Sequence, residues 1–229
     1  MDRNTAFARC TRHLHDLHTV RFDRRGYAKS ASLGAPTIAG HVDDLIGLFD
    51  DRPGVAVGHS LGGVIALAAA QRRPDIVRAV GAFEAPMPWV EWWPTKSAGG
   101  EAMSADTGTT TENARDAAER FMRRMIGDER WEALPVQVKR DRRAEGPALL
   151  AELRSARSEP AYDPTLLTVP VVAGCGTRSR EHHQWAAQEL ARLVGSGELF
   201  VIEGADHSAH VSHHADFAAF VRRVVALAQ

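Results

Sequence analysis

The sequence predicts an α/β fold, in which a mostly parallel sheet is flanked by helices and interrupted by a helical insertion. Short β-branched strand patterns alternate with helical patterns, which is typical of a parallel sheet covered on both faces. The strand over residues 55–57 runs without a gap into an alanine-rich helix. Between residues 86 and 160 no convincing strand pattern occurs. We therefore expect residues 1–85 and 161–229 to form the sheet core and residues 86–160 to form a helical cap.

Length and composition limit the classes of protein that fit. The 229 residues can bury one substantial core, and a formal net charge of −1 gives no electrostatic reason to expect nucleic acid or a membrane as a partner. No apolar run approaches the roughly 20 residues of a membrane span, and the first residues lack the apolar stretch of a secretory signal. Cys10 and Cys175 are the only cysteines, and we expect reduced thiols in a reducing compartment, the cytoplasm.

The spacing of apolar and breaker residues predicts the elements that precede the strand at residues 55–57. Apolar residues recur at three- and four-residue steps over residues 7–17 and predict an amphipathic first helix. A brief strand is expected over residues 19–22. A helical period over residues 38–49 predicts a second helix, which the breaker residues 51–54 end.

The strand at residues 55–57 ends in a run that carries a reactive group. Residues 58–62 (GHSLG) lie between this strand and the helix that follows, which is the context that a G-x-S-x-G nucleophile elbow requires. We expect Gly58 and Gly62 to remove side chains that would clash in the tight turn. The Ser60 hydroxyl is then exposed at the end of the strand, facing the positive end of the helix dipole. The alternative is a tight turn without chemistry.

The remaining core elements alternate in the same way. Strands are predicted over residues 76–83, 169–173 and 199–202, with a helix over residues 183–194 between the last two. A final helix over residues 211–227 closes the chain.

The insertion opens with two proline- and tryptophan-rich clusters and continues through a flexible Gly/Ser/Thr-rich segment up to Thr111. Helical patterns then extend to about residue 156. A helical insertion between two sheet strands favours a lid over a site at the strand ends, with ordinary surface helix as the alternative.

Three ordered motifs resemble the α/β-hydrolase family over nearly the whole chain. Residues 23–30 (DRRGYAKS) are similar to its D-x-R-G-x-G-x-S turn, with Ala28 in place of the second glycine. Residues 58–62 are similar to its elbow, and residues 203–208 (EGADHS) to its catalytic-histidine loop. The resemblance implies a serine nucleophile, then an acid, then a histidine along the chain.

A serine hydroxyl needs a base within hydrogen-bond reach, and we assign this role to His207. A surface histidine is the alternative, with His210, His213 and His214 as competitors close behind. Their three-residue steps also invite a metal site. No carboxylate or cysteine partner completes a ligand set, so we expect no metal and no cofactor.

The acid is where the sequence departs from the family. The aspartate expected after the strand at 169–173 is replaced, and that place holds Ser179. Glu84 ends the buried strand beside the serine strand, where a charged residue needs a reason, and some family members carry the acid there. Glu181, two residues past the vacant position, is the second candidate, and no functional acid the third. Glu84 could instead pair structurally with a cap arginine or a backbone amide.

The resemblance also implies that the Leu61 N–H donates to the oxyanion of the transition state. The second donor normally comes from a His-Gly loop after an earlier strand, and this chain shows no such loop. The strand that the family places between the strand at 19–22 and the elbow strand is missing too. We therefore expect the numbered chain to start late, through a wrongly chosen start or a truncated gene.

Two functions follow. The first is a serine hydrolase that cleaves a small, fairly apolar ester or related acyl compound. The second is a non-catalytic or truncated homologue that binds a small molecule. Oligomeric state is not indicated. Each apolar candidate for substrate binding has core packing as its alternative; the substrate-binding candidates are His59, Met87, Trp89, Trp92, Trp93 and Met125.

Overall fold

The structure, a computed structural model, describes residues 3–34, 36–104 and 110–228. Its internal contacts divide the chain into two compact units. The larger unit comprises Asn4–Arg21, Ala39–Met87 and the chain from Pro160 onward. The smaller unit comprises Phe22–Ile38 and Pro88–Glu159, with Arg3. The segment at 22–38, which the sequence groups with the core, therefore has its contacts in the smaller unit.

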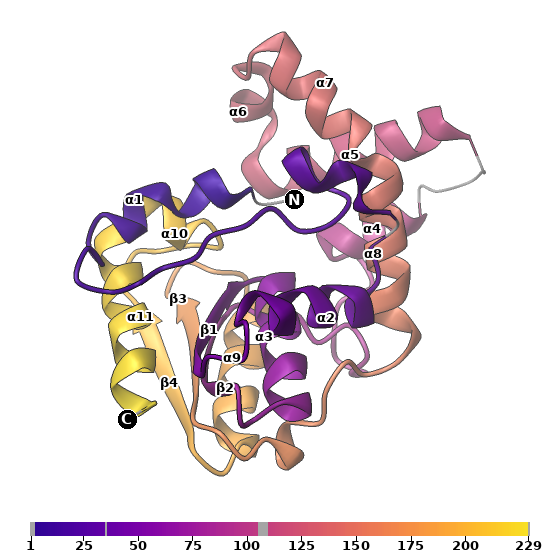
Figure 1. Cartoon of the computed structure of the whole chain (residues 1–229). Helices are drawn as coiled ribbons and strands as arrows, with labels where there is room; N and C mark the ends of the chain where they lie inside the picture. The colour runs from indigo at the N-terminus through magenta and orange to yellow at the C-terminus, as the bar shows by residue number, and fades with distance from the viewer. Residues whose placement is uncertain (1–2, 35, 105–109, 229) are drawn as a thin grey trace. The chain divides into compact units, whose positions relative to one another are not determined.

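The larger unit contains a parallel sheet of four described strands in the order β1-β2-β3-β4 (Figure 1). The register pairs His59 with Phe83 and Phe83 with Gly174. Ser60 and Glu84, one residue further on, therefore leave neighbouring strands at the same edge of the sheet. The strands are β1 (Gly54–His59), β2 (Val77–Phe83), β3 (Val171–Gly176) and β4 (Gly197–Ile202).

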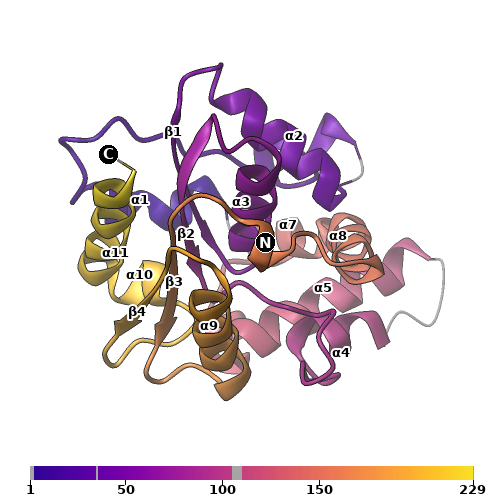
Figure 2. The same cartoon turned by 90° about the horizontal axis from the view of Figure 1, so that it is seen from below.

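Helices cover both faces of this sheet, as the sequence predicts for an α/β fold. Figure 2 shows α11 (His214–Leu227) and α1 (Ala8–Thr11) on one side of the strands, with α3 (Leu61–Arg72) and α9 (Glu181–Leu193) on the other. The predicted fold class is confirmed. The other helices of this unit are η1 (Asn4–Phe7), α2 (Ile38–Leu48), whose first residue belongs to the smaller unit, η3 (Pro164–Leu166) and α10 (Ala209–Ser212).

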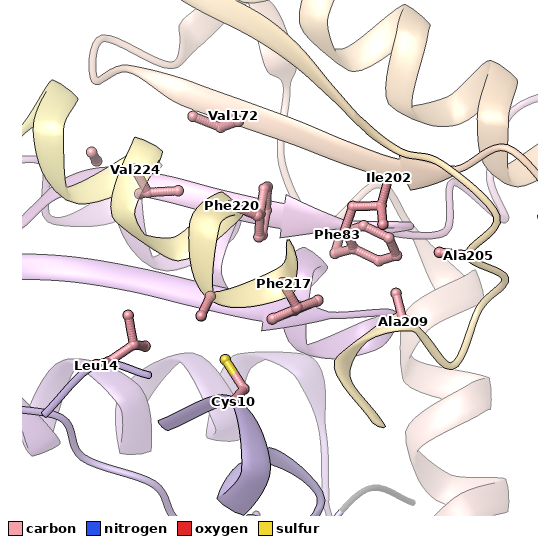
Figure 3. Packing of buried hydrophobic residues seen from close by; sticks show 12 residues of the cluster. Cys10, Leu14, Phe83, Val172, Ile202, Ala205, Ala209, Phe217, Phe220 and Val224 are labelled. Carbon is pink, nitrogen blue, oxygen red and sulfur yellow. The ribbon is translucent and has the colours of Figure 1, made fainter. Parts of the chain in front are cut away.

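One buried apolar cluster of the larger unit lies between α11 and the sheet. The ring of Phe220 packs edge-on against Phe83 with 5.7 Å between centroids. A Cβ on Gly174 would lie 3.0 Å from Phe220, and one on Gly81 would lie 2.7 Å from Val224, so these glycines admit the helix. Figure 3 shows the labelled members of this cluster: Cys10, Leu14, Phe83, Val172, Ile202, Ala205, Ala209, Phe217, Phe220 and Val224.

The smaller unit contains helices joined by turns, and no strand occurs among its described residues. Within it, Arg24 and Tyr27 of the predicted turn at 23–30 bind the buried Glu152 carboxylate at 2.9 and 2.8 Å. A helix occupies part of the segment predicted to be flexible, and residues 105–109 lie outside the described residues. The helices are η2 (Ala28–Leu33), α4 (Ala98–Ser104), α5 (Thr111–Ile126), α6 (Asp128–Glu132), α7 (Val136–Ala144) and α8 (Gly146–Ser158). No helix in the described ranges is long and apolar enough to span a bilayer.

The predicted strand at residues 19–22 is wrong. This stretch has no regular structure, Val20 is 59% exposed, and Arg21 donates to the Asn4 carbonyl oxygen instead of joining a ladder. The predicted helix at residues 7–17 is also shorter, because α1 ends at Thr11 and the chain continues in tight turns. Cys10 and Leu14 are nevertheless buried, so the turns satisfy the same apolar spacing.

Two other boundaries differ for clear local reasons. The strand predicted from residue 169 begins at Val171, since Pro170 has no N–H to offer a ladder. It continues through Gly176, as the glycines there tolerate close neighbours. The final helix predicted over residues 211–227 is broken at His213, which lies outside helical geometry (φ −118°, ψ 48°).

Candidate active site

Ser60 sits in a strained turn between β1 and α3. Its backbone has φ 53° and ψ −128°, a region that L-residues rarely occupy. Its N–H donates to the Phe83 carbonyl oxygen at 2.8 Å, so the strained residue is still tied to β2. Ser60 directly precedes the first turn of α3, at the end of the helix where backbone N–H groups are free. Leu61 is the first residue of α3.

The glycines of the elbow do different work. A Cβ on Gly58 would overlap the backbone of Gly62 and the Gly63 nitrogen, so the tight turn requires glycine there. The same expectation for Gly62 is wrong, because a Cβ built on it meets no described atom within 4 Å beyond its chain neighbours and the nearby backbone of α3. Gly63 is the second tight position, with its Cβ 2.9 Å from that of Ala85. The close approach is therefore between Gly58 at the end of β1 and the backbone of Gly62 and Gly63 at the start of α3.

Glu84 is a buried charged group that hydrogen bonds hold in place. It leaves β2 with φ 49°, and its side chain is fully buried. One carboxylate oxygen, Oε1, accepts hydrogen bonds from the Gly176 N–H at 3.2 Å and from the Ser179 hydroxyl. The other, Oε2, lies 2.6 Å from Nδ1 of His207. The end of β3 thus holds one oxygen of the carboxylate and leaves the other for the imidazole.

These contacts set the charge of Glu84. Burial by itself would raise the pKa of its carboxyl, because a buried carboxylate loses its water. The hydrogen bond and charge of His207, together with the Ser179 hydroxyl, outweigh burial and lower that pKa to about 2. Glu84 is therefore a carboxylate at any pH near neutrality.

His207 lies on the loop after β4 between two other imidazoles. The ring of His59 is 4.4 Å from it on one side, and the ring of His183 is 4.6 Å from it, centroid to centroid. The His59 Nε2–H donates to the His207 carbonyl oxygen at 2.6 Å. Because His59 directly precedes Ser60, this bond ties the histidine loop to the elbow strand.

The other candidates for base and acid lie elsewhere. Glu181 is exposed at the start of α9, outside the Glu84–His207 contact. His210 is buried, with its ring 4.2 Å from that of His59. His213 contacts the Ser212 hydroxyl at 2.9 Å, and His214 pairs with His13 at 3.0 Å on the surface. Among the candidates, the structure brings Glu84, His59 and His207 together.

The apolar candidates are divided between the two units. Met87 is buried in the larger unit, shortly after Glu84. The others belong to the smaller unit, where Trp93 is buried, Trp92 is 40% exposed, and Trp89 and Met125 are half-buried. Trp92 and Trp93 lie 6.1 Å apart, centroid to centroid.

Sequence reasoning missed Ser179 and His183 as members of this site. The nitrogen and oxygen ligand atoms of Glu84, His183 and His207 all lie within 4.8 Å of one another. Burial, and then the charge of His207, lower the pKa of His183 well below its ordinary 6.5. The signal was available, because His183 falls in the first turn of a helix just after a strand end, the edge at which parallel sheets assemble sites.

Comparison with known proteins addresses the family. Residues 5–220 match the model of the alpha/beta hydrolase family. The chain belongs to the alpha/beta hydrolase family. A comparison with curated proteins gives no match.

Solved structures share the hydrolase fold at low sequence identity. The enol-lactonase from Burkholderia xenovorans LB400 is similar with a TM-score of 0.72 and 20% identity, covering 98% of this chain and 87% of that one. MGS-M2, an alpha/beta hydrolase from a Medee basin deep-sea metagenome library, has a TM-score of 0.77 and 17% identity over 98% and 85%. A thermophilic esterase from Thermogutta terrifontis has a TM-score of 0.71 and 18% identity, covering 96% of this chain and 84% of that one.

Acidification is expected to remove stability that Glu84 contributes. Its pKa is about 2 in the folded protein against an ordinary 4.5. Because the folded value is the lower one, the contribution is complete above pH 4.5 and is lost as the pH falls towards 2. The difference corresponds to about 3 kcal/mol of unfolding free energy. Urea denaturation between pH 6 and pH 2.5 measures it, by comparison with Glu84→Gln, in which this part of the pH dependence disappears. Glu181→Gln, at an exposed position, serves as the control. If the unfolding free energy of Glu84→Gln changed with pH as steeply as that of the wild type, the assignment would be contradicted.

Proposed function

We propose that this α/β hydrolase is a serine hydrolase that cleaves a small, fairly apolar ester or related acyl compound through Ser60, His207 and Glu84. The observation that carries the proposal is the 2.6 Å contact of His207 Nδ1 with the buried Glu84 carboxylate. Glu84 follows β2, which pairs with β1, and β1 leads into the strained turn at Ser60. A buried charge aimed at an imidazole has a clear catalytic use, since it holds the ring in one tautomer.

The chemistry follows from that tautomer. With its proton on Nδ1 and directed at Glu84, His207 presents a bare Nε2 that takes the proton of the Ser60 hydroxyl as the oxygen attacks the acyl carbon. The Leu61 N–H stabilises the oxyanion that forms. His207 then gives its proton to the leaving group. Water next attacks the acyl carbon while His207 takes its proton, and the bond to Ser60 breaks as His207 returns that proton to the serine oxygen. The Ser179 and Gly176 hydrogen bonds keep Glu84 in place through both halves.

The substrate class is inferred from the similar structures and from the apolar candidates. The similar structures include an enol-lactonase and an esterase, which their names describe as acting on esters. Met87 is the apolar candidate that the larger unit itself supplies close in sequence to Glu84. A lid formed by residues 86–160, and substrate contacts of Trp89, Trp92, Trp93 and Met125, stay predictions. Both cysteines are buried thiols, and burial raises the pKa of each to about 11. A reducing compartment such as the cytoplasm stays a prediction.

A fluorophosphonate probe tests the nucleophile, because it reacts with an activated serine and forms a stable adduct. We expect the purified protein to be labelled once, at Ser60, and Ser60→Ala to lose all labelling. Ser212→Ala, which removes an exposed serine of the same unit, should be labelled like the wild type. Peptide mass spectrometry identifies the modified residue. Absence of labelling in protein that is folded by circular dichroism would favour the alternative, a small-molecule binding protein.

A further inference from the structure

We propose that Glu84, His183 and His207 form an inhibitory binding site for Zn²⁺, in which the metal takes the base and the acid of the proposed reaction out of service. The inference rests on the proposed function for its effect on activity, but the metal site itself does not depend on it.

The ligand set is the first argument. Two imidazoles and one carboxylate are a ligand set that zinc sites in proteins use, with a water in the fourth position. Each of the three side chains offers one atom, and these atoms lie within 4.8 Å of one another. Tetrahedral coordination with Zn–N and Zn–O distances near 2 Å requires ligand atoms roughly 3.3 Å apart. The ligand atoms must therefore approach one another by up to about 1.5 Å for a tetrahedral site to form.

The framework around the three ligands is the second argument. Glu84 comes from the end of β2, His183 from the first turn of α9 and His207 from the loop after β4, all in the larger unit. The far carboxylate oxygen is already fixed by Gly176 and Ser179, as the second-shell partners of metal ligands are. The stacked His183 ring lies against His207, 15% of whose side chain remains exposed. An ion can therefore reach the group.

The consequence for catalysis follows from the two nitrogens of His207. When Zn²⁺ binds at Nδ1, the proton that Nδ1 carries moves to Nε2. Nε2 is then protonated and cannot accept the Ser60 proton. When Zn²⁺ binds at Nε2, the lone pair itself is used. In either case no free base nitrogen faces the serine. Binding at Nδ1 also replaces the hydrogen bond between His207 and Glu84.

Metal binding is tested first, without reference to activity. Untagged protein is titrated with Zn²⁺ by calorimetry, and with Co²⁺ while its visible absorption is recorded. We expect one site per chain, with an intense absorption typical of low-coordinate cobalt. His183→Ala should weaken Zn²⁺ binding by at least about 100-fold, and His183→Gln, which preserves bulk and polarity, should do the same. His182→Ala removes the neighbouring histidine of the same helical turn and should bind like the wild type.

Inhibition is tested second, as the ratio of activity with and without Zn²⁺ within each variant, so that changes in basal turnover cancel. The wild type and His182→Ala should be inhibited with the same half-maximal zinc concentration, and chelation should restore activity. His183→Ala and His183→Gln should need at least about 100-fold more zinc.

Four results would overturn the site. They are no binding to the wild type, equal weakening in His182→Ala, loss of binding on removal of the surface pair His13 and His214, and activation by zinc. An active enzyme that binds no zinc refutes the metal site and leaves the proposed function standing. Zinc bound at the predicted residues in a protein without hydrolase activity refutes the function and leaves the site.

Discussion

Replacing Glu84 with glutamine is expected to lower kcat by about 10⁴-fold and to change KM only slightly. Glutamine has nearly the same shape, but its amide is neutral and can present an N–H to His207 where the carboxylate presents only lone pairs. The imidazole then favours the tautomer with its proton on Nε2, facing Ser60, and cannot accept the serine proton. The imidazolium that forms during the reaction also loses its counter-charge. Steady-state kinetics on a chromogenic short-chain ester measure both constants.

The control for this substitution is Glu181→Gln, which changes the other carboxyl considered from the sequence. Glu181 is exposed at the start of α9, and its replacement should leave kcat within about two-fold of the wild type. Glu84→Asp should recover part of the turnover, since it restores the charge at a longer distance. Loss of kcat in Glu181→Gln together with an unaffected Glu84→Gln enzyme would transfer the acid role to Glu181. A rise in KM alone would make Glu84 a structural residue.

Gly58→Ala is expected to destabilise the larger unit by at least about 4 kcal/mol, enough to lower the yield of folded protein sharply. The new Cβ would overlap backbone atoms of Gly62 and Gly63. Backbone cannot rotate away as a side-chain end can, so β1 and α3 would have to separate. That separation breaks packing along the whole buried length of α3 and displaces Ser60. Thermal and urea unfolding of the purified variant measure the loss.

Gly62→Ala is the matched control, because it adds the same methyl group to the same turn. Beyond its chain neighbours and the nearby backbone of α3, no described atom lies within 4 Å of that position, and alanine is a better helix former than glycine. We expect unfolding free energy equal to the wild type or higher by up to about 1 kcal/mol. If both variants are equally unstable, the close approach of β1 and α3 at Gly58 is not what constrains the turn.

The sheet, the elbow turn and the position of Glu84 could be predicted from the sequence, because all three depend on local patterns. The elbow is a strand, a tight turn and a helix in immediate succession, and Glu84 is a charge at the end of an apolar strand. The strand at 19–22 fails for the opposite reason. Its β-branched residues match strand propensity, but a strand exists only where another strand pairs with it, and pairing is not a local property.

Other parts of the site lay outside what spacing could predict. Ser179 gains its role from the position of β3 beside β2, which brings two residues nearly 100 positions apart in sequence together at the Glu84 carboxylate. The difference between Gly58 and Gly62 is likewise invisible in the motif, where the two glycines look equivalent. Only the direction of each absent Cβ separates them.

Ser60 and Glu84 share one further property, since both hold a positive φ that glycine would adopt at no steric expense. Strain of this kind amounts to about 1–3 kcal/mol at each residue. Glycine would relieve that strain but would remove the hydroxyl and the carboxylate on which the proposed reaction depends. Any programme of thermostabilisation should therefore leave both residues unchanged.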